Sequence, residues 1–287
     1  AWEPLGFKPV GFAEIEPFPC ELLKQKYPAV KNYGDITQYE KWNAGQFDIL
    51  AGGTPCQSFS IAGKRGGTAD ERGALMYAYL GIVEAYRPRW IVWENVPGVL
   101  SSNSGYDFAS FFAGLEECGY GWAYRVLDAQ YFGVPQRRRR VFVVGHSDNR
   151  TDLAAEVLFE QQGVCGNIAA GSETQKETTD AIGKGVNYFR RGGNYKYHKD
   201  KKAATLRSSA ASDCFDLVLT SEKKYIRRLT PLECERLQGF PDDYTQIEWR
   251  GKPAEQCPDT PRYKAIGNSM AVPVMRWIGE RIKRFEE

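Results

Sequence analysis

The sequence predicts an α/β protein with a doubly wound, mostly parallel sheet and a small irregular domain. Short apolar runs alternate with helical periodicity up to residue 146, as repeated βα units do. From residue 147 to about residue 225 that periodicity fades, and Gly, Thr, Ser and Lys dominate. At 287 residues and 42% hydrophobic content, the chain can form one large or two modest globular domains.

The first half contains the elements of the predicted sheet in alternating order. Strands are expected at residues 9–14, 47–51 and 90–93, with two more around residues 131–140. Helices are expected at residues 17–27, 74–86 and 107–118. Gly119 follows the third helix and fits a C-cap, because glycine adopts the left-handed conformation at little cost.

The second half contains fewer regular elements, among them a short strand candidate at residues 215–219. Thr230 and Glu233 have capping-box spacing with proline between them, so a helix is expected from there to Gly239. A last helix is expected to begin near Asn268 and to bury one apolar face, formed by Val272, Met275, Ile278, Ile282 and Phe285. We therefore expect a sheet domain at residues 1–146, an irregular domain at 147–262 and a returning helix at 263–287.

Composition limits the class of protein. No run approaches the ~20 apolar residues that span a bilayer, and seven cysteines without a Cys-x-x-Cys pair argue against a disulfide framework or a zinc cluster. The expected location is the cytoplasm. A net charge of +2 does not indicate a polyanionic partner by itself, although basic residues cluster at 137–140 and 190–202. His146 and His198 are the only histidines, and His146 is expected in a loop.

A cysteine directly behind an apolar run is the first candidate for chemistry. Residues 46–53 form that run, end in two glycines and precede Thr54-Pro55-Cys56-Gln57-Ser58. Cys56 should therefore project from the carboxyl end of a strand, where open α/β sheets place their sites. It is a candidate nucleophile if its surroundings favour the thiolate. Taken alone, it is more often an ordinary cysteine.

Two further segments supply charged side chains at strand ends. Glu94 ends the run at 90–93, where burial would raise its pKa and favour proton donation, although most such acids form structural ion pairs. Arg138 and Arg140 share one face of the next strand by alternation and could hold a carbonyl oxygen or favour a thiolate. The alternative is a basic surface patch.

Five motifs in order give a specific resemblance. They are Pro55-Cys56-Gln57, Glu94-Asn95-Val96, Gln136-x-Arg138-x-Arg140, the segment from Arg228-Leu229-Thr230-Pro231 to Gln238-Gly239-Phe240-Pro241, and Gly267-Asn268-Ser269. Together they resemble DNA (cytosine-5) methyltransferases of bacterial or phage type, over nearly the whole chain except its variable middle. The resemblance implies the S-adenosylmethionine-dependent methyltransferase fold, with a target-recognition domain in the irregular segment.

The activity implied by this resemblance is methyl transfer from S-adenosylmethionine to carbon 5 of a cytosine flipped out of duplex DNA. The catalytic residues would be Cys56, as a covalent nucleophile at carbon 6, Glu94, as the acid at ring nitrogen 3, and Arg138 and Arg140, at the cytosine carbonyl oxygen. Residues 58–73 resemble the family's mobile active-site loop. A monomer without metal is expected, associated with the nucleoid. A cognate restriction endonuclease would act on the same site without being bound.

The resemblance also assigns binding residues. Glu14 matches the acid that bonds the cofactor ribose, Ile15 the residue that covers adenine, and Asp35 the acid at the adenine amino group. With these, the expected cofactor-binding set is Glu14, Ile15, Asp35, Ile36, Pro55, Asn268 and Ser269, the last two offering backbone donors at a helix start. The expected DNA-binding set is Gln57, Ser58, Arg190, Arg191, Lys196, Lys199, Lys201 and Lys202.

One departure and two alternatives accompany this resemblance. The family opens with a strand and a glycine loop, whereas this sequence starts at Ala1 just past them, so residues upstream of Ala1 are expected in the natural protein. Without that strand, both of its neighbours would lose ladder partners. A tRNA cytosine methyltransferase is disfavoured because its Cys-Phe-Thr element is not found. An inactive DNA-binding protein is disfavoured because all four catalytic residues occur.

Overall fold

The structure, a computed structural model, describes residues 1–54, 73–159, 187–191, 197–200, 203, 217–219 and 226–286. Its central sheet has four strands in the order β3-β4-β6-β5. Their bounds are β3 Ile49–Gly53, β4 Trp90–Asn95, β5 Gly121–Asp128 and β6 Arg139–His146. A separate pair, β1 Gly11–Phe12 and β2 Lys31–Asn32, is parallel. The α/β class is therefore confirmed.

The pairing in the central sheet is mixed, because one of its four strands runs opposite to the other three. β3 and β4 are parallel, whereas β6 is antiparallel to both of its neighbours, β4 and β5. β4 and β5 therefore run the same way, as their intervening helix requires. β6 follows β5 through a connection without a long helix, so it returns in the opposite direction and inserts between β4 and β5.

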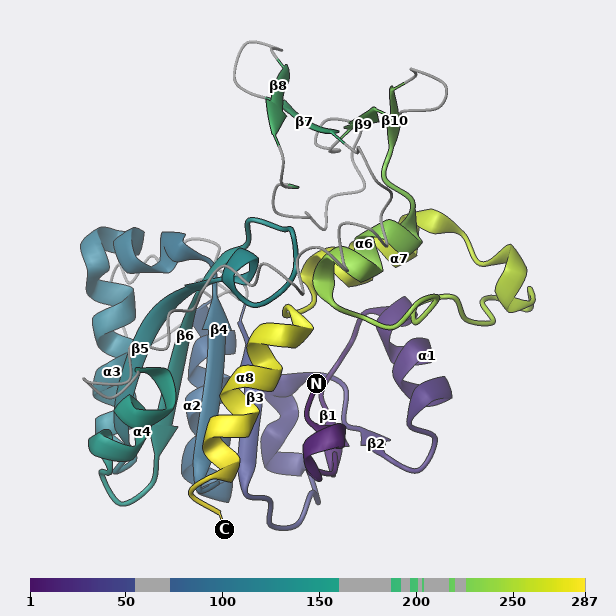
Figure 1. The fold of residues 1–287 in the computed structure, drawn as a ribbon. Coiled ribbons are helices and arrows are strands. Elements are labelled where there is room, and N and C mark those ends of the chain that lie inside the picture. Colours follow the sequence, from purple (N-terminus) through teal and green to yellow (C-terminus); the bar gives the residue numbers. More distant parts are fainter. Residues whose placement is uncertain are drawn as a thin grey trace.

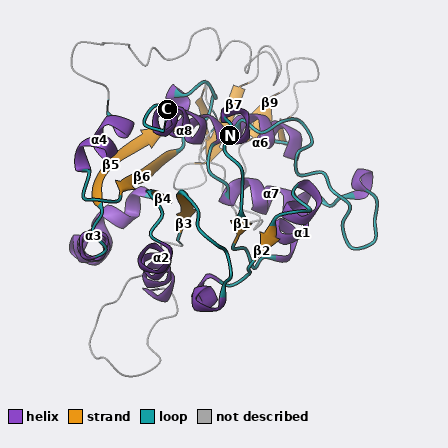
Figure 2. Cartoon of the chain, turned by 90° about the horizontal axis from the view of Figure 1, so that it is seen from below, coloured by secondary structure: helices purple, strands orange, loops and turns teal. Residues whose placement is uncertain are grey.

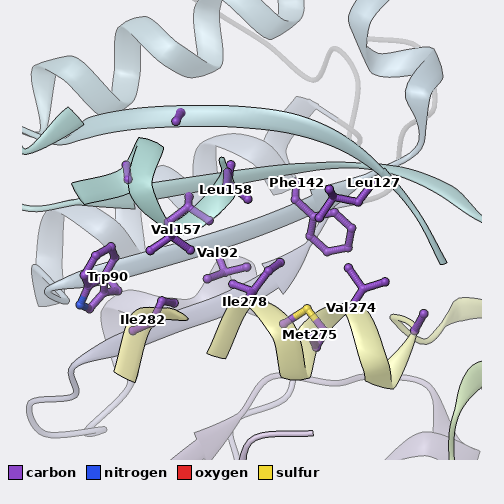
Figure 3. Close-up of a cluster of buried hydrophobic side chains, with 14 of the residues drawn as sticks. Trp90, Val92, Leu127, Phe142, Val157, Leu158, Val274, Met275, Ile278 and Ile282 are labelled. Carbon is purple, nitrogen blue, oxygen red and sulfur yellow. The ribbon is translucent and has the colours of Figure 1, made fainter. Parts of the chain in front are cut away.

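Helices cover both faces of this sheet (Figures 1 and 2). One face packs against α2 Gly73–Tyr86 and α3 Tyr106–Glu117, and the other against α4 Thr151–Leu158 and α8 Val272–Lys283. Along β4, Trp90 and Val92 point to the α8 side, and Ile91 and Trp93 to the α2 side. Figure 3 shows the apolar cluster between the sheet and α8. A strand buried on both faces explains its continuous apolar run.

A second sheet, in the order β10-β9-β7-β8, is entirely antiparallel. It comprises β7 Asn187–Arg191, β8 Tyr197–Asp200, β9 Leu217–Leu219 and β10 Ile226–Arg228. In Figure 1 it lies beyond helices α6 Pro231–Gln238 and α7 Asp259–Asn268, apart from the central sheet. The remaining elements are α1 Pro17–Lys26 and the 3-10 segments η1 Glu3–Leu5, η2 Ile36–Lys41, η3 Pro97–Gly105, η4 Ala129–Tyr131 and η6 Ala254–Gln256. Within the described ranges, no helix is long and apolar enough to cross a membrane.

Most expected elements of the first half occur, with shifted ends. The strand expected at 9–14 keeps two paired residues in β1, and that expected at 47–51 lies at 49–53. Gly119 has φ +81° behind α3, as the C-cap expectation required. α4 was not predicted from the sequence; it packs on the central sheet although it follows residue 146. His146 was expected in a loop, but it is the last residue of β6, and its ring meets Trp90 edge-on.

The C-terminal region contains two helices where one was expected. Asn268 is the last residue of α7, Ser269 is its C-cap, and α8 begins only at Val272 with Pro273 in its first turn. The Ser269 N–H is already bonded to the carbonyls of Ala265 and Ile266, at 3.1 and 3.2 Å. The expectation that Asn268 and Ser269 open a helix with free backbone donors is therefore wrong. The sequence did not predict α7 because its residues show little apolar periodicity.

The two sheets of the first half are not hydrogen-bonded to each other among the described residues. β1 pairs only with β2, and β3 only with β4. Asn32, at the end of β2, adds side-chain bonds to this small pair. Its Oδ1 accepts from the backbone N–H of Glu14 at 3.0 Å and of Gly34 at 3.2 Å. Its Nδ2 donates to the Glu14 carbonyl at 2.9 Å.

The start of α6 is held by the capping box that the sequence predicted. The Thr230 hydroxyl accepts from the Glu233 N–H, and the Glu233 carboxylate accepts from the Thr230 N–H. Arg227, on β10, adds two bonds of 2.7 Å to the same carboxylate. Burial disfavours the charge on Glu233, but these bonds outweigh burial and lower its pKa below the ordinary value. One carboxylate therefore joins β10 to α6.

Replacing Glu233 with alanine is expected to lower the free energy of unfolding by about 1–3 kcal/mol, because it removes the cap and leaves Arg227 without this partner. Since the folded pKa is lowered, the stabilisation is present above the ordinary carboxyl pKa and disappears as pH falls through the folded pKa. Urea unfolding of wild type and Glu233→Ala across this range measures both effects. Glu255→Ala, at an exposed acid, is the control. A pH-independent difference would contradict the argument.

Candidate active site

β3 and β4 end side by side, and their last residues are in direct contact. Gly53 is the register partner of Glu94. A Cβ at Gly53 would lie 2.8 Å from the Glu94 carbonyl oxygen and 3.3 Å from its Oε2, so a side chain does not fit without movement. The Glu94 carboxylate therefore lies against the end of β3, three residues before Cys56. Cys56 itself lies outside the described residues.

The segment that leads to Cys56 is tied to β4 by two side chains. Trp93 Nε1 donates to the Thr54 hydroxyl at 3.2 Å, and Asn95 Nδ2 donates to the Thr54 carbonyl at 2.9 Å. Thr54 and Asn95 are both buried. Neither residue was among the predicted site residues. The only signal for Asn95 was its place in the Glu94-Asn95-Val96 motif.

Glu94 forms a buried ion pair with Arg140. The Arg140 Nε lies 2.9 Å from Glu94 Oε1, with side-chain exposures of 14% and 12%. Burial raises the pKa of Glu94, while the charges of Arg140 and Arg138 oppose that rise. Burial also lowers the pKa of Arg140. A carboxyl group with a raised pKa that still keeps a cationic neighbour can donate a proton and take it back.

The two inward-facing arginines have different partners. Burial alternates as expected, because Arg138 and Arg140 turn inward while Arg137 and Arg139 are exposed. The Arg138 Nη2 donates to the carbonyls of Ser269 and Gly267, at 2.6 and 3.2 Å. Burial, and next the charge of Arg140, lower the pKa of Arg138 to about 10. Arg138 is therefore hydrogen-bonded to the end of α7, whereas Arg140 forms its ion pair with Glu94.

The residues expected around the cofactor ribose and adenine lie on two neighbouring turns. Glu14 Oε1 accepts from the N–H groups of Ile15 and Glu16, each at 2.8 Å, which fixes the carboxylate. Ile15 is 68% exposed, which is unusual for a large apolar side chain. Asp35 caps η2, which begins at Ile36, by accepting from Thr37 at 2.9 Å. Because β1 and β2 are parallel, Glu14 and Asp35 follow them at the same edge.

The end of α7 is linked to the same region. Lys264 Nζ lies 2.6 Å from Glu16 Oε2, two residues beyond Glu14. Asn268 and Ser269 follow Lys264 at the end of that helix. An acid at each of two turns, an exposed apolar side chain and a polar turn nearby are the residue types that fit an adenosyl group with an amino-acid tail. Pro55, from the same expected set, lies outside the described residues.

The expected DNA-binding residues are described only in part. Arg190 and Arg191 lie on β7, and Lys199 lies on β8, as backbone positions without described side chains. Gln57, Ser58, Lys196, Lys201 and Lys202 lie outside the described residues. In the register of the two strands, Phe189 opposes Lys199 and Arg190 opposes His198. The basic cluster therefore belongs at least in part to the second sheet.

Comparison with known proteins gives one family. The model of the C-5 cytosine-specific DNA methylases matches residues 1–184 and 161–284. Type II methyltransferase M.NlaX of Neisseria lactamica is 32% identical over 94% of this chain and 87% of its own length. A protein of Escherichia phage P1 named DNA N-6-adenine-methyltransferase is 36% identical over 99% of this chain, which spans 59% of that relative.

A solved structure shows the same fold. The Dnmt2 methyltransferase of S. pombe superposes with a TM-score of 0.67, covering 98% of this chain and 92% of its own. Its sequence identity is 17%, so the likeness concerns the fold alone. The expected methyltransferase fold is therefore confirmed.

Replacing Arg140 with methionine is expected to raise the pKa of Glu94 further. Burial raises this pKa, and the charge of Arg140 is the largest influence that lowers it. Carbon-13 NMR of glutamate-labelled protein during a pH titration measures this shift. Arg139→Met, one position along the strand and exposed, is the matched control and should leave the titration unchanged. Equal shifts in both variants would show that Arg140 has no special relation to Glu94.

Proposed function

Because the chain belongs to the C-5 cytosine-specific DNA methylase family, we propose that it methylates carbon 5 of a cytosine flipped out of duplex DNA. The observation that carries this proposal is the buried Glu94–Arg140 pair, which lies against the end of β3 just before Cys56. Extrusion of the base costs a few kcal/mol and is needed because ring atoms are inaccessible within a stacked duplex.

Cys56 acts as the nucleophile in this proposal. Its thiolate adds to carbon 6 of the ring while Glu94 donates a proton to nitrogen 3, so that carbon 5 becomes electron-rich. Bound S-adenosylmethionine supplies the electrophilic methyl group that carbon 5 accepts. Loss of the carbon 5 proton to a base, return of the nitrogen 3 proton to Glu94 and departure of the thiolate then regenerate the enzyme.

The two arginines support this chemistry from different positions. Arg140, which forms an ion pair with Glu94, is placed to donate to the cytosine carbonyl oxygen, where negative charge develops. Arg138, bonded to two carbonyls at the end of α7, adds positive potential behind Arg140. A positive potential also favours the Cys56 thiolate over the thiol.

The cofactor is held by the turns after β1 and β2 and by the end of α7. Glu14 Oε1 is fixed by two backbone donors, and we propose that Oε2 accepts from the ribose hydroxyls. Ile15 covers the adenine ring, beside Ile36 and Pro55, and Asp35 accepts from the adenine amino group. The side chains of Asn268 and Ser269, and not their backbone donors, bind the methionine end.

Sequence recognition resides mainly in residues 150–225, within the proposed recognition domain at 147–262. The Arg190–Arg191 pair and the lysines of this segment lie close to DNA, with Gln57 and Ser58 near the extruded base. Residues 58–72, most of the segment that resembles the family's active-site loop, lie outside the described residues. We further propose a cytoplasmic, nucleoid-associated monomer, with a cognate restriction endonuclease that shares its site without binding it.

Other acceptors would give different products. A relative is named as an adenine N6 methyltransferase, and RNA would be the acceptor of a tRNA cytosine methyltransferase. Radioactive methyl transfer to duplex DNA and to tRNA, followed by nucleoside analysis of the product, separates these cases. 5-Methylcytosine in DNA is expected. N6-methyladenine, or label in tRNA alone, would overturn the proposal.

Duplex DNA that contains 5-fluorocytosine at the methylated position is expected to trap the enzyme covalently through Cys56. The reason is that fluorine at carbon 5 blocks the final proton loss, so the thiolate cannot leave. Gel electrophoresis under denaturing conditions detects the adduct, and peptide mapping locates it. Cys118→Ser, at a cysteine behind α3, is the control and should still trap. Trapping by Cys56→Ser would show that the nucleophile is another residue.

Exchange of residues 160–225, which leaves α4 in place, for the corresponding segment of a relative with another target is expected to move the methylated sequence, because base contacts carry the specificity. Single Arg190→Ala or Lys199→Ala variants are expected to weaken DNA binding and to flatten its salt dependence, since phosphate contacts release counterions. Methylation sequencing and binding titrations across salt measure these effects. An active chimera with the original specificity would contradict the assignment.

A further inference from the structure

Gln238, the last residue of α6, is a fully buried polar side chain that the proposed reaction does not use. We propose that Gln238 is a positioning residue: by fixing the turn at the end of α7, it sets the place of Arg138 beside Arg140 and Glu94. The inference rests on the proposed function for its catalytic meaning. Its geometry, however, can be tested in the free protein.

The side-chain amide of Gln238 is surrounded by oxygen atoms of one turn. Nε2 donates to the Ile266 carbonyl at 2.9 Å, and lies 3.3 Å from the Ser269 carbonyl and 3.4 Å from the Ser269 hydroxyl. All three atoms are acceptors for an N–H donor, so the orientation of the amide is determined by its surroundings. Gln238 therefore fastens the end of α6 to the end of α7.

The same turn holds Arg138. The Ser269 carbonyl, which accepts from Gln238, also accepts from Arg138 Nη2 at 2.6 Å, and the neighbouring Gly267 carbonyl accepts from that nitrogen at 3.2 Å. The guanidinium group is thus bonded to a piece of backbone whose position depends on the amide. Without the Gln238 amide, the turn would lose its hydrogen bonds to the end of α6 and could move. The Arg138 guanidinium, which is bonded to the turn, would then move with it.

The burial of Gln238 has a cost that packing alone does not explain. Its Oε1 is buried and has no hydrogen-bond partner among the described residues. An apolar side chain of similar length would fill the same space without leaving an acceptor unsatisfied. Retention of a buried, incompletely satisfied polar group is typical of a position where a functional constraint prevails over stability.

The position of Arg138 matters for Glu94 because its charge opposes the effect of burial there. After Arg140, Arg138 is the next influence that lowers the pKa of Glu94. If the guanidinium shifts away with a loosened turn, the Glu94 carboxyl should titrate at higher pH. Gln238 touches neither Glu94 nor Arg140 in any described contact, so such a shift would have to pass through the turn and Arg138.

The test uses Gln238→Met, which keeps the length of the side chain and removes its donor. Leu237→Val is the matched control: Leu237 is the neighbouring residue, equally buried, and packs with Leu229 and Ile266 instead of bonding the turn. Carbon-13 NMR of labelled glutamate gives the Glu94 titration in the full-length protein. Thermal unfolding confirms that each variant is folded.

An upward shift of the Glu94 titration in Gln238→Met, but not in Leu237→Val, is the expected result. An unchanged or lowered Glu94 pKa in Gln238→Met overturns the inference, as does an equal shift in the control. Methyl transfer to duplex DNA should fall by roughly 10–100-fold in kcat/KM, as small misplacements in active sites do. Gln238→Met should also lose a smaller fraction of its activity at alkaline pH than wild type does, because its Glu94 stays protonated up to a higher pH.

A double variant separates positioning from general destabilisation. Arg138→Lys alone removes the group that the turn holds, so adding Gln238→Met should reduce kcat/KM little further. Full additivity would overturn the inference. If wild type transfers no methyl group while the Glu94 titration shifts as expected, the proposed function fails and the positioning role stands.

Discussion

The buried pair of Glu94 and Arg140 is the interaction on which the arrangement of the site depends. Removing two charges from water is costly unless they meet in good geometry. Their meeting requires the end of β4 and the start of β6 to lie at the same edge of the sheet. An antiparallel β6 fulfils this, with Asn95 opposite Val141 in the register. A parallel strand would carry its first residues to the opposite edge.

Part of this arrangement follows from the sequence by simple rules. Short apolar runs predicted the positions of β3 and β4, and the end of the second run predicted the place of Glu94. The predicted place of Cys56 lies outside the described residues. The period of two predicted that Arg138 and Arg140 turn the same way, and their burial agrees. The capping box predicted α6 because its two reciprocal bonds involve residues only three positions apart. Such sequence rules succeed for features whose interacting residues are only a few positions apart in the sequence.

The features that sequence reasoning missed have distant partners. The place of β6 between β4 and β5 depends on its pairing with β4, which is distant in the sequence. The repeat of strands and helices does not encode that place. α7 has few apolar residues and therefore little helical periodicity, so its end at Asn268 was mistaken for the start of α8. Asn32 and Gln238 have roles set by the backbone oxygens and N–H groups that surround them in the fold. A single sequence gives no sign of such neighbours.

The site must also accommodate a second buried arginine beside the first. Burial, and next the charge of Arg140, lower the pKa of Arg138. The Arg138 guanidinium lies at the end of α7, where carbonyl groups concentrate partial negative charge and favour a cation. Gly267 and Ser269 supply those carbonyls to Arg138, which leaves Arg140 to Glu94. Both arginines bring positive charge close to Glu94, and positive charge favours an anion at the end of β3. A thiolate and a cytosine oxygen that gains charge in the reaction both meet that description.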